Sequence, residues 1–298
     1  MGDDMDKKNP GEPASRPEGT REMVLDWLHN QLINIEKHVN KDVLTIYGDI
    51  GEGVDTRVRA ALESMDTPVN NISQKRTKPL LVILTTDGGS IEITKVISNT
   101  LRHFYDTVHF LVPVKAMSAG TVLTMSGDAI YMDYFSRLGP IDPQILKGGM
   151  YIPALSYLHQ YEKMREKAKK GELTSADLVL LQKLDLAELH SIELYKEMSV
   201  DLITEWLSRY KFKDWQKDGV PRTDYEKRAR AEEIANKLNA QDKWFIHGHG
   251  IHMDVLRNEL KLKIDDYSSD SVLKSLVWKY WWMVFDNSRS FVHSRNLI

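Results

Sequence analysis

Apolar runs alternate with amphipathic stretches through residues 42–132, and this alternation is the strongest structural signal in the chain. Residues 80–84 (LLVIL) are continuously apolar, as in a strand buried on both faces, and residues 91–105 then carry the pattern of a helix. A second apolar run occupies residues 108–114. Because strands that alternate with helices form parallel sheets with helices on their faces, the pattern predicts an α/β fold.

Shorter segments extend the same alternation. The sequence predicts a strand over residues 42–50 (DVLTIYGDI), a helix over 56–65, a buried helix over 119–127 and a strand over 129–132. We therefore expect the parallel sheet to be built mainly from the first half of the chain.

The character of the chain changes after about residue 150. Residues 155–240 are highly charged and predict helices, with one apolar stripe that we expect to be a core or subunit-contact face. In the aromatic-rich tail, Leu273, Val277, Trp281 and Val284 follow one helical face, which is typical of a packed helix or an oligomer contact. The apolar stripe within residues 155–240 comprises Leu178, Leu181, Leu184, Leu186, Leu189, Ile192, Met198, Leu202 and Ile203.

Composition narrows the class of protein. The 298 residues are 42% hydrophobic and 28% charged, which is ordinary for a soluble globular protein, and the formal net charge of −3 gives no electrostatic reason to expect nucleic acid as a partner. The absence of cysteine excludes disulfides, thiolate nucleophiles and cysteine-ligated metals. The first residues lack the apolar core of a signal peptide and no stretch is long enough for a membrane span, so we expect a cytoplasmic protein.

Two glycine-containing corners carry the candidate chemistry. Asp87-Gly88-Gly89-Ser90 follows the first apolar run, and Met117-Ser118-Ala119-Gly120 follows the second, 30 positions later. Because neighbouring parallel strands end at one sheet edge, the two corners should meet. Acyl transfer needs what they offer, namely backbone N–H donors for an oxyanion and a hydroxyl nucleophile.

Both corners also have simpler interpretations. Asp-Gly-Gly-Ser is an ordinary turn sequence, and Ser118 is a preferred residue type for the N-cap of a helix. If Ser118 is instead a nucleophile, the N–H of Ala119 is the second expected oxyanion donor. Spacing alone leaves the nucleophile and the cap as equal alternatives.

Four segments together resemble the Clp-fold serine peptidases, in particular the SDH-type (serine dehydrogenase proteinase) family, which is related to ClpP and to the SppA and NfeD proteases. The segments are DVLTIYGDI, LVILTTDGGS, AMSAG and LGPIDPQ. The resemblance implies a ClpP/crotonase-like ββα superhelix, here with a helical C-terminal extension, and a homo-oligomer. It also implies that Gly88 and Gly89 form the oxyanion loop and that Ser118 is the nucleophile.

The general base is less well marked. The SppA and NfeD relatives use a lysine on a later helix, and Lys163 lies in the matching stretch, with Lys167 as second choice. A lysine acts as a base only if burial lowers its pKa, and the run YEKMREKAKK is more often a solvated helix face. His247, in HGHGIH, is an alternative base, since the SDH-type family has a histidine in the corresponding loop. Asp142 is expected either to orient a base or to cap a turn.

Neither a metal nor a cofactor is expected, because HGHGIH has glycines typical of a loop and no carboxylate at the helical spacing of a metalloprotease motif. The leading hypothesis is a serine endopeptidase that cleaves a peptide or protein through an acyl-enzyme. The alternatives are a crotonase-like acyl-CoA enzyme that needs no serine nucleophile, and a Clp-fold scaffold without catalysis.

The resemblance and the composition together suggest four segments. Residues 1–20, with three prolines, should be disordered. Residues 21–150 should form the Clp/crotonase-like core with the nucleophile and the oxyanion loop, residues 151–265 a helical arm and the completion of the core, and residues 266–298 an aromatic-rich C-terminal helix.

Overall fold

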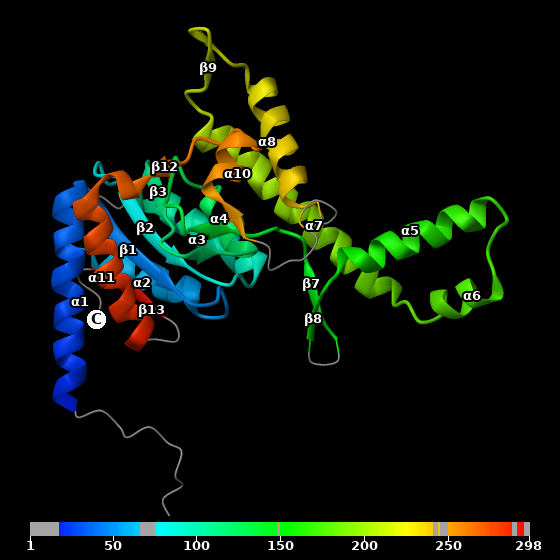
Figure 1. The fold of residues 1–298 in the computed structure, drawn as a ribbon, viewed down its shortest axis with the longest axis horizontal. Helices are drawn as coiled ribbons and strands as arrows, with labels where there is room; N and C mark the ends of the chain where they lie inside the picture. Colours follow the sequence, from blue (N-terminus) through cyan, green and yellow to red (C-terminus); the bar gives the residue numbers. More distant parts are fainter. Residues whose placement is uncertain are drawn as a thin grey trace, which may run out of the picture.

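The computed structural model describes residues 18–65, 75–147, 150–240, 244, 250–287 and 291–294. Its centre is a six-stranded sheet with the order β12-β5-β3-β2-β1-β13 (Figure 1). All neighbours in this sheet are parallel except β13, which pairs antiparallel with β1. The strands are β1 (Asp42–Tyr47), β2 (Leu80–Thr85), β3 (Val108–Leu111), β5 (Ala129–Met132), β12 (Asp265–Asp266) and β13 (Phe291–Ser294).

Two layers of helices cover the sheet, and the alternation of side chains along each strand separates them. On β2, Leu80, Val82 and Leu84 face one core, whereas Leu81 and Ile83 face the other. The first core is covered by α2 (Val54–Ser64), α3 (Ile91–Phe104), α4 (Ala119–Thr124), the end of α7 (Leu186–Trp206) and α8 (Asp224–Leu238). The second is covered by α1 (Glu18–Val39) and α11 (Ser271–Asn287), which pack against each other.

The predicted α/β fold with a parallel sheet is confirmed, and so is the buried face of the last helix. Leu273, Val277, Trp281 and Val284 are all buried on α11. The predicted strand over 108–114 is too long, because β3 ends at Leu111, two residues before Pro113. Residues 1–17, which hold most of the segment expected to be disordered, lie outside the described residues.

A small second sheet lies at the carboxyl edge of the central one. Its strand order is β11-β6-β4, and Met117 connects β4 to Ser118. The strands are β4 (Lys115–Ala116), β6 (Arg137–Leu138) and β11 (Ile251–His252).

A helical arm leaves the body after the hairpin of β7 (Gln144–Lys147) and β8 (Met150–Pro153) (Figure 1). The arm consists of α5 (Leu155–Lys169), α6 (Ser175–Leu181) and the first half of α7. The predicted apolar stripe is therefore divided. Leu178 and Leu186 are exposed, Leu189 and Ile192 pack within the arm, and Leu202 and Ile203 belong to the main core.

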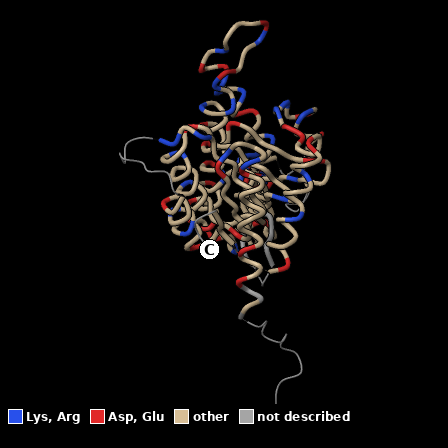
Figure 2. Tube along the Cα trace, turned by 90° about the vertical axis from the view of Figure 1, so that its left-hand side faces the viewer, with Lys and Arg blue, Asp and Glu red and all other residues tan. Residues whose placement is uncertain are grey.

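None of the described helices is long and apolar enough to cross a bilayer. Lys and Arg are intermingled with Asp and Glu in Figure 2. The remaining described elements are the π-helix η1 (Leu207–Lys211), β9 (Gln216–Lys217), β10 (Val220–Pro221), α10 (Met253–Asn258) and the 3₁₀-helix η2 (Tyr267–Ser269).

A buried histidine makes the stability of the fold depend on pH. His293 on β13 is fully buried beside Tyr280, whose hydroxyl lies 3.0 Å from His293 Nδ1, and burial lowers the pKa of His293 to about 4. The unfolded state binds the proton near pH 6.5, so the free energy of unfolding should fall as the pH drops from about 6.5 towards 4. Urea titrations across this range should show a shallower fall for His293→Gln. His190→Gln, which replaces an exposed histidine on α7, is the control substitution.

Candidate active site

A backbone bridge between the two sheets joins the two corners. Thr86, the residue after β2, pairs in parallel with Ala116 at the end of β4. The N–H of Thr86 donates to the carbonyl of Lys115, and the N–H of Met117 donates to the carbonyl of Thr86, each at 3.0 Å. The corners predicted to meet at one sheet edge do meet, and the bridge is the reason.

Gly88 lies directly against the serine. A Cβ atom built on Gly88 would be 2.9 Å from the Cβ of Ser118 and 3.0 Å from the carbonyl oxygen of Met117. Real Cβ atoms do not approach that closely, and the φ of Gly88 is +116°, which L side chains rarely adopt. Only glycine fits at this position.

Gly89 is held by the loop after β1. The N–H of Ile50 donates to the carbonyl of Gly88 (2.7 Å), and the N–H of Ser90 donates to the carbonyl of Ile50 (2.8 Å). In this parallel bridge the N–H of Gly89 itself points to the side opposite Ile50. A Cβ atom on Gly89 would lie 2.2 Å from the carbonyl oxygen of Ile50, so a side chain here would break the bridge.

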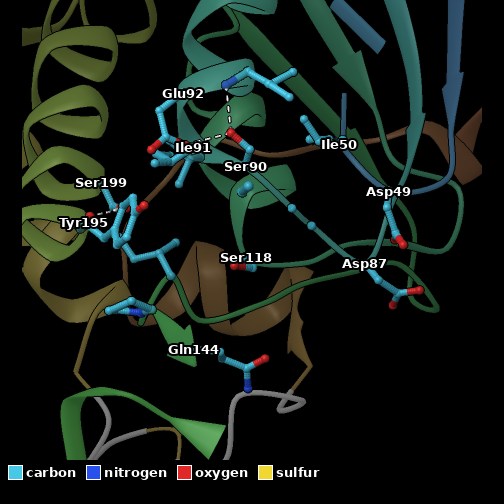
Figure 3. A pocket seen from close by; sticks show the side chains of 18 of the residues that line it. Asp49, Ile50, Asp87, Ser90, Ile91, Glu92, Ser118, Gln144, Tyr195 and Ser199 are labelled. Atoms are coloured by element: carbon cyan, nitrogen blue, oxygen red, sulfur yellow. Dashed lines mark hydrogen bonds between the residues drawn. The ribbon is translucent and has the colours of Figure 1, made fainter. Parts of the chain in front are cut away.

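Ser118 has an unusual backbone. Its φ of 50° and ψ of −117° place it in a region that costs a non-glycine residue about 1–3 kcal/mol. Ser118 occupies the N-cap position of α4, but its side chain makes no capping hydrogen bond there. Ser118 is half-buried and lines a pocket (Figure 3). A strained serine between a strand and a helix is the arrangement of a nucleophile elbow.

The expected oxyanion donors differ in availability. The N–H of Ala119, the first residue of α4, has no partner within its helix. Among the described residues, no hydrogen bond occupies the N–H of Gly89. The N–H of Gly88, by contrast, donates to Thr86 Oγ1 at 3.0 Å. Two of the three predicted donors, which line the same pocket as Ser118, thus have no hydrogen-bond partner among the described residues.

The pocket around Ser118 has a volume of about 710 Å³. Five parts of the chain form its wall, namely the loop after β1, the diglycine corner with the start of α3, α4, the segment after β6, and α7. Sequence reasoning missed the contribution of α7, because nothing local indicates that Tyr195 and Ser199 return to the sheet edge. It could have found Asp49, which lies near the end of the predicted strand 42–50, at the same edge as Asp87.

The candidate bases are not among the described residues that line this pocket. Lys163 is exposed on α5, in the arm that leaves the body, and Lys167 Nζ lies 3.1 Å from Asp177 Oδ1 (Figure 1). The fold of a single chain therefore does not bring either lysine to Ser118. His247 lies outside the described residues. Asp142 is buried between Ile141 and Pro143, which both line the pocket.

Residues 69–276 match the family described as ClpP-like SDH-type serine proteinases, well over half of the chain. The chain belongs to this family. The matched range includes both corners, the arm and β11, so the ClpP-like fold expected from the four sequence segments is confirmed.

Two relatives of this chain are uncharacterized proteins of Methanocaldococcus jannaschii. MJ0137 is 36% identical over 104 residues, which cover 35% of each chain. MJ1495 is 33% identical over 100 residues, which cover 34% of this chain and 33% of the relative. The chain thus aligns with about a third of the length of each curated relative.

The glycine geometry of this family member gives a direct test of how the corner is held. Gly89→Ala should lower the free energy of unfolding by at least about 1–2 kcal/mol, because it adds a left-handed penalty to the clash with Ile50. Gly51→Ala is the matched control, since Gly51 lines the same pocket and a Cβ there meets nothing within 4 Å. Chemical denaturation measures both. Equal stability of the two variants would contradict the described packing of Gly89.

Proposed function

We propose that this chain is a serine peptidase in which Ser118 is the nucleophile. The observation that carries the proposal is the strained backbone of Ser118, whose side chain faces the pocket instead of capping α4. Strain of this kind persists only where the surrounding structure enforces it, and it gathers at functional sites. Membership of a serine proteinase family supports the same role.

We assign the oxyanion site to the N–H groups of Gly89 and Ala119. Gly89 belongs to the corner that packs against Ser118, and Ala119 is the residue after Ser118. Ala119 also lies at the positive end of α4. Gly88 contributes mainly by leaving room for Ser118, because its own N–H is bonded to Thr86.

The reaction follows from these assignments. Ser118 Oγ attacks the peptide carbonyl carbon, and its proton passes to the general base. The C–N bond breaks as the base gives that proton to the leaving amine, which leaves an ester on Ser118. A water molecule then attacks the ester with the help of the same base, releasing the carboxylic acid and restoring the hydroxyl.

For the base we propose His247, ahead of Lys163 and Lys167. Both lysines lie on the arm, and neither lines the pocket. His247 precedes Ile251 by four positions, and Ile251 pairs with Leu138 of β6, the strand beside β4. A segment of four residues spans at most about 14 Å. β11 and β4 lie two strand spacings apart, which is roughly 10 Å. The segment between His247 and Ile251 is therefore long enough to cover the distance from β11 to β4.

We also propose that copies of this chain assemble with one another. Several large apolar side chains of the arm are exposed in the single chain, as expected for a surface covered by a neighbour. They are Leu178, Val179, Leu180, Leu186 and Leu194.

Covalent labelling tests the nucleophile. A fluorophosphonate probe should label the wild type and fail to label Ser118→Ala. Ser199→Ala is the matched control, because Ser199 lines the same pocket but its hydroxyl donates to the carbonyl of Tyr195. Intact-mass spectrometry measures the adduct. Equal labelling of the wild type and Ser118→Ala would exclude Ser118 as the nucleophile. Thermal stabilisation of both proteins by an acyl-CoA would then favour the crotonase-like alternative.

Peptide turnover tests the base. His247→Ala should lower kcat by about 10²–10⁴-fold, the usual contribution of general acid–base catalysis. Lys163→Ala and Lys167→Ala should retain the wild-type rate, and light scattering should show all three variants in the wild-type assembly. If Lys163→Ala loses turnover while its assembly stays intact, Lys163 is the general base and reaches Ser118 from a neighbouring chain.

A further inference from the structure

One buried side chain contacts both corners of the site. Thr86, the residue after β2, is 1% exposed, and its two branches meet different segments. Its Oγ1 accepts a hydrogen bond from the N–H of Gly88 at 3.0 Å and donates to the carbonyl oxygen of Gly88 at 3.3 Å. Its methyl group packs on α4, since a Cβ atom built on Gly120 would lie 2.3 Å from Thr86 Cγ2. The proposed oxyanion donors, Gly89 and Ala119, are the chain neighbours of these two glycines.

The hydrogen bonds at Gly88 set the direction of the N–H of Gly89. In a planar trans peptide, the C=O of one residue and the N–H of the next point in opposite directions. The carbonyl of Gly88 is held by the N–H of Ile50 at 2.7 Å as well as by the hydroxyl of Thr86. The N–H of Gly89 therefore points away from Ile50, towards the side on which Thr86 pairs with β4. Gly88 is buried whereas Gly89 is exposed and lines the pocket, so this donor faces the place of a substrate.

The Thr86 hydroxyl starts from a fixed main chain. The N–H of Thr86 donates to the carbonyl of Lys115, and its own carbonyl accepts from the N–H of Met117. The branched Cβ and the contact of the methyl group with α4 then restrict the rotamer, which leaves Oγ1 directed at Gly88. Among the described residues, the bonds to the main chain of Gly88 come from the backbone of Ile50 and from this hydroxyl. The hydroxyl is the part of this support that a substitution removes.

We propose that Thr86 is a positioning residue, whose hydroxyl orients the Gly88–Gly89 peptide so that the N–H of Gly89 meets the oxyanion. The described lining of the pocket does not include Thr86, so it acts through the glycines and not on the substrate. An oxyanion donor is effective only when it lies about 2.7–3.1 Å from the developing charge, which makes the rate of attack sensitive to the orientation of this peptide. The inference deepens the proposed function and rests on it.

The kinetics of labelling by a fluorophosphonate test this role. When Ser118 Oγ bonds to phosphorus and fluoride leaves, negative charge develops on the phosphoryl oxygen, as it does on the oxygen of an attacked carbonyl. Thr86→Val keeps the shape of the side chain but leaves the N–H of Gly88 without its acceptor. The maximal rate of labelling (kinact) should therefore fall about 10–100-fold. The probe concentration for half-maximal rate (KI) should change less than about twofold, because the lost effect belongs to the transition state.

Three further variants separate the hydroxyl from a general loss of stability. Thr86→Ser keeps the hydroxyl but loses the methyl group that fixes its rotamer, so its kinact should lie between those of the wild type and Thr86→Val. Thr86→Cys also lacks the methyl group and has only a weak acceptor, so it should react more slowly than Thr86→Ser. Thr124→Val is the matched control and should react as the wild type does. It removes another buried threonine hydroxyl, which donates to the carbonyl of Thr121 within α4.

Circular dichroism and urea titrations show whether each variant is folded. A folded Thr86→Val with the wild-type kinact would overturn the inference and leave the proposed nucleophile in place, and so would equal kinact values for Thr86→Ser and Thr86→Val. If Thr86→Val does not fold, equal kinact values for Thr86→Ser and Thr86→Cys have the same meaning. A wild type that the probe does not label contradicts Ser118 as the nucleophile, and the role of Thr86 is then rejected with it.

Discussion

The geometry of the candidate site depends on the backbone bridge between Thr86 and Ala116. This bridge joins the central sheet to the small sheet, and two hydrogen bonds of 3.0 Å fix its register. With that register set, Gly88 meets Ser118 and Gly89 meets Ile50 at distances that tolerate no side chain. Three separate segments are thus brought within contact by main-chain atoms alone, which vary less in position than long side chains.

The same register shows how strain at Ser118 is tolerated. A residue with φ of 50° and ψ of −117° would relax if its neighbours allowed it. Before it, the N–H of Met117 is bonded to Thr86, and after it the buried helix α4 continues from Ala119. Gly120 is also fixed, because a Cβ there would lie 2.3 Å from Thr86 Cγ2. The free-energy cost of the strained residue is offset by this packing on both sides.

Local patterns in the sequence were sufficient for β1, β2, β3 and β5 of the sheet and for both corners. The run LLVIL predicted β2, and the position of Ser118 after an apolar run predicted its place at the sheet edge. The short strand β13 could not be predicted, because its four residues show little period-two pattern and its pairing with β1 is antiparallel and distant in sequence. The contribution of Tyr195 to the pocket was equally inaccessible, since it depends on how the arm returns to the body.

The position of β13 has a consequence for how the protein is made. β1 is synthesised early, yet its outer neighbour β13 follows some 240 residues later in the chain. Until translation has passed that point, one border of the nascent sheet presents open backbone groups on an apolar strand, the kind of surface that other chains can join. The outer edge of β1 is therefore the last part of this sheet border to gain its backbone partner during synthesis.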